Sequence, residues 1–266
     1  MEFWRRLGSG RLSELYGERT LEQDRLVRTL GWRRIAEEAY RLLDADTRAA
    51  LDSYAQGVNA YLETHGGRLG LEFTLLWYAG ARFAPEPWVP ADTLTWTLVM
   101  AWELSGGVRS DLLRAALVDR VGIPRALELL PAYPADRPLI VPGAGAAGAP
   151  APPLEADVIV GGATLAAVPW DTLDALGEAL GAGPGLGSNN WVLSGDRTAT
   201  GRPMLANDPH LRAQMPSVWY EIGLHCEPVG PDCPYRVVGA SFPGMPGVMI
   251  GHNERIAWGV TNANPD

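Results

Sequence analysis

A stretch rich in proline, glycine and alanine divides the sequence into two parts. It is clearest at residues 142–150 (PGAGAAGAP), and a second glycine-rich run, GAGPGLG, ends at Gly187. Such a stretch cannot bury enough apolar surface to offset the entropy cost of ordering it. We therefore expect a linker or spacer region over residues 131–187. The short amphipathic run at residues 170–180 belongs either to this spacer or to the part before it.

The part before the linker, residues 1–130, is predicted to be helical. Apolar side chains recur at helical spacing over residues 26–43 and again over residues 46–66. The apolar run at residues 93–104 is too short to cross a membrane and indicates a buried helix. A further helix is expected at residues 111–121.

The part after the linker, residues 188–266, has a different hydrophobic pattern. Short apolar runs, many of them β-branched, alternate with turn residues at 190–193, 204–206, 218–225, 235–238, 248–250 and 256–260. This pattern predicts an antiparallel sheet. The expected fold class is therefore α+β, with a helical part followed by an antiparallel β part.

The overall charge and the chain ends exclude some classes of protein. The net charge is −9 and no lysine is present, whereas a non-specific nucleic-acid binder needs a basic face. No apolar run is long enough to span a membrane, and the first residues, MEFWRR, lack the pattern of a signal peptide. Because the chain starts and stops abruptly, we expect it to be a piece of a larger precursor.

The two cysteines, Cys226 and Cys233, flank a turn-forming segment that contains two prolines and a glycine. A disulfide across this turn is geometrically reasonable and would indicate an oxidising compartment. The alternative is two free thiols. The spacing does not match a zinc site.

Ser188 lies where the linker meets the first predicted strand, and its chemistry depends on activation. The sequence around it has neither a G-x-S-x-G elbow nor an S-x-x-K motif, and a Ser-His-Asp triad would need a histidine such as His210, His225 or His252 to approach in space. If the Gly187–Ser188 bond is cut, however, Ser188 becomes an N-terminus. Its own α-amine, with an unperturbed pKa of roughly 7.7–8.0, then provides a base for its hydroxyl. Glycine before the serine would allow strained backbone geometry at the cut.

Several motifs together resemble the penicillin acylase family of N-terminal nucleophile amidohydrolases, which includes penicillin, cephalosporin and acyl-homoserine-lactone acylases. In the β part these are GSNNW at 187–191, TATGRPMLANDPH at 198–210, GHN at 251–253 and AWG at 257–259. In the helical part they are GRLSEL at 10–15, YAQGVNAY at 54–61 and DLLRA at 111–115. The resemblance covers nearly the whole chain except the linker.

The resemblance implies a precursor that is cut into an α-chain, a discarded spacer and a β-chain beginning at Ser188. The mature fold would be a four-layer αββα sandwich, of which this chain holds a part. The implied activity is hydrolysis of acyl amides in the periplasm or outside the cell, on a small-molecule substrate and without an organic cofactor. Because the chain ends before much of the implied β-chain, we expect it to be inactive alone.

The resemblance also assigns roles to individual residues. His210 corresponds to a polar residue beside the nucleophile, and the backbone N–H of Asn262 corresponds to an oxyanion-hole donor. Without the resemblance, His210 would be predicted to be a strand-end or turn histidine and Asn262 a turn asparagine. Asp266 and, more roughly, Asp111 correspond to ligands of a structural calcium ion, for which carboxylate oxygens are suitable. The alternative for both is a solvated surface acid or a helix cap.

Three apolar residues match positions of the family's acyl pocket, namely Leu211, Ile250 and Val260. Ordinary sheet core is an equally good interpretation of these side chains. Two further functions stay open from the residues alone. One is a non-catalytic secreted binding module made of two folded parts, and the other is a conventional Ser/His hydrolase.

Overall fold

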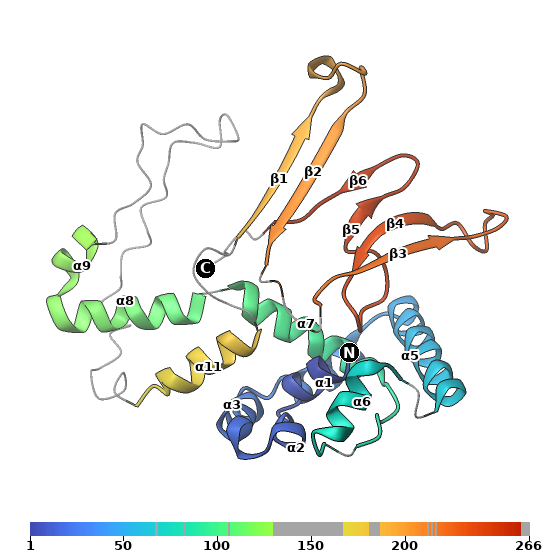
Figure 1. Ribbon diagram of the computed structural model, residues 1–266. Coiled ribbons are helices and arrows are strands. Elements are labelled where there is room, and N and C mark those ends of the chain that lie inside the picture. Colours follow the sequence, from blue (N-terminus) through green and yellow to red (C-terminus); the bar gives the residue numbers. More distant parts are fainter. Residues whose placement is uncertain are drawn as a thin grey trace. The chain divides into compact units, whose positions relative to one another are not determined.

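The computed structural model describes residues 1–66, 69–81, 83–105, 107–129, 167–180, 187–211, 213, 215 and 217–261. The chain forms two compact units, one of Met1–Leu104 with Asp171–Ala263 and one of Ser105–Trp170 with Asn264–Asp266. The first unit combines helices with antiparallel strands, which confirms the predicted α+β class (Figure 1). The second contains α8 (Gly107–Val121) and α9 (Ile123–Leu129). The predicted spacer falls mostly outside the described residues.

The first unit carries most of the described helices. They are α1 (Glu2–Gly8), α2 (Ser13–Tyr16), η1 (Gly17–Thr20), α3 (Leu21–Leu30), α4 (Trp32–Leu42), α5 (Ala45–His65), α6 (Leu71–Tyr78), α7 (Pro90–Ser105) and α11 (Trp170–Leu180). The helical spacing predicted over residues 26–43 is interrupted at Gly31, whose φ of 75° ends α3 in the left-handed region. Asp44 caps α5 by accepting a hydrogen bond of 2.8 Å from the Thr47 N–H.

Helices α6 and α9 lie in the part predicted to be helical, but neither was predicted as a separate helix. In α6 the sequence LEFTLLWY is apolar on nearly every side, so it lacks the alternation of polar and apolar faces on which the helix predictions depend. The predicted helix at residues 111–121 is confirmed but begins earlier, at Gly107.

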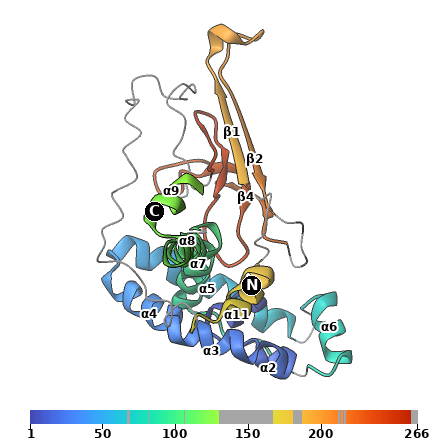
Figure 2. The same ribbon diagram turned by 90° about the vertical axis from the view of Figure 1, so that its left-hand side faces the viewer.

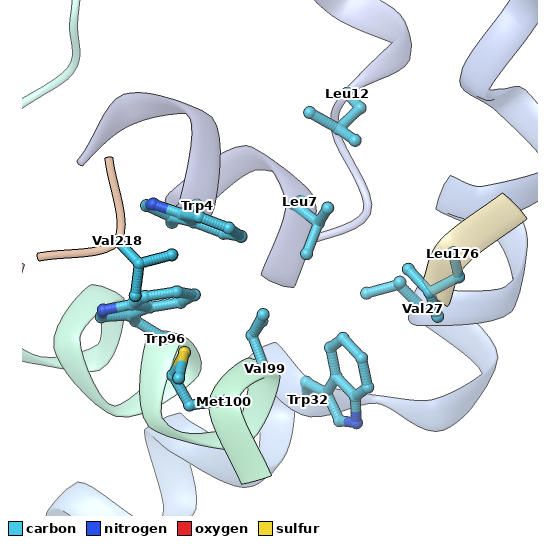
Figure 3. Close-up of a cluster of buried hydrophobic side chains, with 10 residues drawn as sticks. All are labelled: Trp4, Leu7, Leu12, Val27, Trp32, Trp96, Val99, Met100, Leu176 and Val218. Carbon is cyan, nitrogen blue, oxygen red and sulfur yellow. The ribbon is translucent and has the colours of Figure 1, made fainter. Parts of the chain in front are cut away.

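The hydrophobic core of the first unit lies between α1, α3, α4, α7 and α11 (Figure 3). Trp4 of α1 stacks on Trp96 of α7 with ring centroids 4.2 Å apart, and Val218 packs beside this pair. Leu176 of α11 is fully buried and lies next to Val27 of α3. Helix α11 therefore packs into the helical core, so the amphipathic run at residues 170–180 is part of a folded body.

The strands form two antiparallel sheets. One is the pair β1 (Gly187–Leu193) and β2 (Met204–His210), which run side by side in both views (Figure 1, Figure 2). The other has the order β3-β4-β5-β6, formed by β3 (Tyr220–His225), β4 (Arg236–Ser241), β5 (Ile250–His252) and β6 (Ala257–Trp258). Cys226 and Cys233 form a disulfide with a Cα–Cα distance of 5.7 Å, just beyond the end of β3.

Strand β2 continues four residues beyond the predicted run at 204–206. The segment Asn207-Asp208-Pro209 has the composition of a turn, yet it pairs with Asn190, Asn189 and Ser188 of β1. Proline has no N–H to donate to a sheet, and it is tolerated here because Pro209 lies near the end of a strand with one described neighbour.

The loop at Gly244 joins the second sheet to the helices. Its N–H donates to the Tyr54 hydroxyl at 3.0 Å, and its carbonyl oxygen accepts from the Thr93 hydroxyl at 2.7 Å. A Cβ at Gly244, where φ is 114°, would lie 3.3 Å from the Trp88 ring. A glycine is therefore required for this close approach.

Among the described residues, no helix combines the length and apolar character needed to cross a membrane.

Candidate active site

Ser188 is the second residue of β1 and lies opposite Pro209 of β2. Its side chain is partly buried, and its Oγ donates a hydrogen bond of 2.6 Å to the carbonyl oxygen of Gly187. The hydroxyl therefore lies against the peptide unit that joins the two residues. Glycine before the serine would allow strained backbone geometry at the cut, but in the intact chain the backbone at Gly187 is regular. Gly187 pairs regularly with His210, its φ is not in the left-handed region, and an added Cβ would meet no atom within 4 Å.

His210 is brought to the same end of the strand pair but faces away from Ser188. It lies directly opposite Gly187, and alternate residues of a strand point to opposite faces of a sheet. Its Nε2 lies 2.9 Å from Oδ2 of Asp208, and both side chains are exposed. In the intact chain, His210 is therefore oriented by Asp208. In the part of the chain that the structure describes, neither His225 nor His252 is hydrogen-bonded to Ser188.

Asn207 links β1 and β2 to the segment that follows β6. Its side-chain Nδ2 donates to the carbonyl oxygens of Asn189 at 3.1 Å and Val260 at 2.9 Å. Its Oδ1 accepts from the Val260 N–H at 3.0 Å. All three polar contacts are to backbone groups, so the amide holds Val260 as a neighbouring strand would.

Two further residues of the same segment lie close to the β1–β2 pair. The Thr261 hydroxyl donates to the carbonyl oxygen of Ser188 at 3.0 Å. A Cβ on Gly259 would lie 2.6 Å from Nδ2 of Asn190 and 2.8 Å from Cβ of Asn207. Since real side chains never tolerate such distances, only a glycine lets the segment pack this closely against β1 and β2.

The three residues matched to the acyl pocket do not share one environment. Ile250 lines a groove of about 740 Å³ between β2 and the second sheet, together with Asn207, Glu221 and His252. Leu211 packs against the hydrophobic core instead, and the Val260 side chain is 53% exposed. The structure therefore brings Ile250 to a concave surface, and the roles of the other two as pocket residues stay predictions.

Of the two residues matched to a calcium site, the structure describes only Asp111. Asp111 lies in α8 with an exposed side chain, and its Oδ1 is 3.3 Å from the Arg114 guanidinium. Asp266 and the oxyanion candidate Asn262 lie outside the described residues. Within the described ranges, no group of three or more histidine, cysteine, aspartate or glutamate side chains could hold a metal ion.

Three residues near Ser188 were not predicted from the sequence to take part in the site, namely Asn207, Gly259 and Thr261. Asn207 and Gly259 belong to the motifs ANDPH and AWG, which carry the family resemblance but do not by themselves indicate a role for either residue. The side chain of Asn207 reaches a backbone 53 residues later in the chain, which no local pattern could indicate.

Comparison with known proteins supports the motif assignment. The family model for penicillin amidase matches residues 1–266. The chain is 34% identical over 267 residues to the penicillin acylase 2 proenzyme of Pseudomonas sp. (strain SE83). The aligned region covers 100% of this chain and 32% of that protein. It is 31% identical over 258 residues to the acyl-homoserine lactone acylase QuiP of Pseudomonas aeruginosa, covering 97% of this chain and 28% of that protein.

A more distant relative is the penicillin G acylase of Escherichia coli, at 25% identity over 98% of this chain and 34% of that protein. The chain thus spans about a third of the length of these curated relatives. The family model, in contrast, matches the chain from its first residue to its last, so the resemblance of the motifs is confirmed and the chain belongs to the penicillin amidase family.

Proposed function

We propose that the protein containing this chain is an acyl-amide hydrolase of the N-terminal nucleophile type, with Ser188 as the nucleophile. Membership of the penicillin amidase family supports this proposal, as do the names of relatives that act on penicillins and acyl-homoserine lactones. The observation that carries it is the Ser188 hydroxyl, 2.6 Å from the carbonyl oxygen of Gly187 at the first residues of β1. In the mature enzyme the sheet that contains β1 would be part of an αββα sandwich.

The first step of the proposal is cleavage of the Gly187–Ser188 bond. The Ser188 Oγ attacks the carbonyl carbon of Gly187, its proton passes to the departing nitrogen, and the C–N bond breaks to leave an ester. Water then hydrolyses the ester, which gives a carboxylate on Gly187 and a free α-amine on Ser188. The hydrogen bond of the hydroxyl to the Gly187 carbonyl oxygen supports the step because it keeps the nucleophile beside the carbonyl group that it attacks.

The second step is catalysis by the new N-terminus. The α-amine of Ser188 takes the proton from its own hydroxyl, and the Oγ attacks the carbonyl carbon of the substrate amide. The C–N bond of the amide breaks, and the amine product leaves with the proton. Water hydrolyses the acyl ester on Ser188 and releases the acid. We expect the rate to increase with pH through the pKa of an α-amine, roughly 7.7–8.0 when unperturbed.

The remaining assignments are part of the same proposal. The N–H of Asn262 stabilises the oxyanion, and His210 acts beside the nucleophile once the cut has freed Ser188 from residue 187. The acyl group lies near Ile250, Leu211 and Val260, whose apolar side chains suit an aliphatic or aromatic acid. Asp111 and Asp266 contribute oxygen ligands to a structural calcium ion.

We also propose that the enzyme works in the periplasm or outside the cell. The Cys226–Cys233 disulfide supports this location, because disulfides persist in oxidising compartments.

Mass spectrometry of the expressed full-length gene product tests the proposal. We expect a polypeptide that begins at Ser188, and hydrolysis of at least one member of a panel of acyl-homoserine lactones, penicillins and N-acyl amino acids. Ser188→Ala should stay uncut and inactive. The matched control is Ser194→Ala, whose exposed hydroxyl bonds to Asp196 beyond the end of β1 and whose loss should change neither result.

Two outcomes would contradict the proposal. One is an active protein in which the Gly187–Ser188 bond stays intact, which favours a conventional Ser/His hydrolase. The other is the absence of hydrolysis together with separate folding of the two parts after removal of the linker, which favours a binding module.

A further inference from the structure

We propose that Asn207 is a positioning residue that fixes the segment after β6 against the nucleophile strand. The inference rests on the proposed function, in which residue 262 supplies an oxyanion N–H to the substrate bound at Ser188. In this inference the side chain of Asn207 acts on the N–H of residue 262 through the backbone, and it does not itself contact the substrate.

The hydrogen bonds of Asn207 leave its amide little freedom. Its Nδ2 donates to both Asn189 and Val260, and its Oδ1 accepts from Val260, with distances between 2.9 and 3.1 Å. Val260 thus has both its N–H and its carbonyl oxygen bonded to one side chain. An asparagine amide is a suitable group for this purpose because it offers two N–H donors and an acceptor oxygen in a single plane.

The position of Asn207 connects this bonding to Ser188. Asn207 lies opposite Asn190 in the β1–β2 pair, so its side chain is on the same face as those of Asn190 and Ser188. Its second donor bonds to the carbonyl oxygen of Asn189, the residue that directly follows the nucleophile. The Asn207 amide therefore holds the backbone of Val260 against β1, the strand that carries Ser188.

Two other contacts also hold the segment after β6 against the β1–β2 pair. The Thr261 hydroxyl donates to the Ser188 carbonyl oxygen at 3.0 Å, and Gly259 approaches Asn207 so closely that a Cβ would lie 2.8 Å away. Residue 262 follows Val260 by only two residues in the sequence. An oxyanion donor is effective only when it is held in place before the charge develops. Asn207 provides that constraint.

The test uses two substitutions in the full-length protein. Asn207→Asp keeps the acceptor for the Val260 N–H but removes both donors and sets a carboxylate against two carbonyl oxygens. Asn207→Ala removes all three hydrogen bonds. For the panel substrate that is hydrolysed fastest, we expect kcat to fall by roughly ten- to a hundredfold in either variant, with KM nearly unchanged. Hydrogen exchange of the Val260 backbone amide should become faster in Asn207→Ala.

Asn253→Asp is the matched control. Asn253 lies between β5 and β6 and uses its side-chain oxygen to accept from the N–H groups of Arg255 and Ile256, both at 2.8 Å. Aspartate can accept the same two hydrogen bonds while adding the same charge as Asn207→Asp. We expect its kcat to match that of the wild-type protein.

The possible outcomes separate this inference from the proposed function. An active wild-type enzyme whose kcat is unchanged in both Asn207 variants overturns the inference alone. The same holds if Val260 exchange is unchanged in Asn207→Ala, or if KM increases while kcat stays constant, since that pattern indicates a substrate contact. A wild-type protein that hydrolyses no acyl amide overturns the proposed function, and the positioning role with it.

Discussion

Replacement of Gly259 by alanine tests whether the segment after β6 really packs against the nucleophile strand pair. An ideal Cβ at this position would lie 2.6 Å from Nδ2 of Asn190 and 2.8 Å from both Cβ and Oδ1 of Asn207. The Asn190 amide is the far end of a side chain and can rotate away. The Cβ of Asn207 is fixed by the backbone of β2, so the segment itself must move.

The cost of this movement can be estimated from similar substitutions. Overpacking of a well-packed site typically destabilises a protein by about 1–3 kcal/mol. If the displaced segment carries the oxyanion donor, a loss of this size in the transition state reduces kcat by up to roughly a hundredfold. We therefore expect Gly259→Ala to lower both the melting temperature and kcat.

The assay compares Gly259→Ala with Gly57→Ala by thermal unfolding and by steady-state kinetics. Gly57 is exposed in α5, and a Cβ there meets no atom within 4 Å. This control should be as stable as the wild type, or more stable by about 0.5–1 kcal/mol because alanine favours a helix. Adding Asn190→Ala to Gly259→Ala should restore stability in part, since it removes the 2.6 Å contact but leaves Asn207 in place. A Gly259→Ala protein with wild-type stability and kcat would refute the reasoning.

Two further predictions concern the helical part. Asp24 is 4% exposed and accepts hydrogen bonds of 2.8 Å from two backbone N–H groups at the start of α2, so Asp24→Ala should destabilise the protein by about 2–4 kcal/mol in thermal unfolding. Glu22→Ala removes an exposed acid from the same first turn of α3 and should change stability by less than about 0.5 kcal/mol. Burial raises the pKa of Glu103 to about 7, so the folded protein keeps a proton that the unfolded chain releases, and stability should fall as pH increases from about 4.5 to about 7. Glu103→Gln should therefore stabilise the protein at pH 8, by up to about 3 kcal/mol, and have no such effect at pH 4; equal effects at both pH values would contradict the assignment.

Much of the fold was predictable because its helices and strands have regular hydrophobic patterns. The buried helix α7 and the strands after Ser188 were expected within a few residues of their observed bounds. The helix α6 was missed because it is apolar on nearly all sides, and the extension of β2 was missed because Asn-Asp-Pro is typical of a turn. In both cases the tertiary environment outweighs the local pattern.

The candidate site was predictable only where the chemistry is local. Ser188 and the bond before it could be singled out because glycine, serine and the strand start are adjacent in the sequence. The contact between Asn207 and Val260 depends on the pairing of strands far apart in the chain, so no spacing rule indicates it. The same holds for Leu176, whose burial beside Val27 ties α11 to the helical core.

The central claim is that Ser188, with a free α-amine, carries the acyl group during the reaction. The most direct measurement is peptide mapping by mass spectrometry of the full-length gene product, quenched in acid during turnover of its best acyl-amide substrate. We predict that the mass of the acyl group appears on a peptide that begins at Ser188, and that chemical blocking of its α-amine prevents this labelling. An acyl group on another residue, or on a peptide in which Gly187 is still joined to Ser188, would contradict the account.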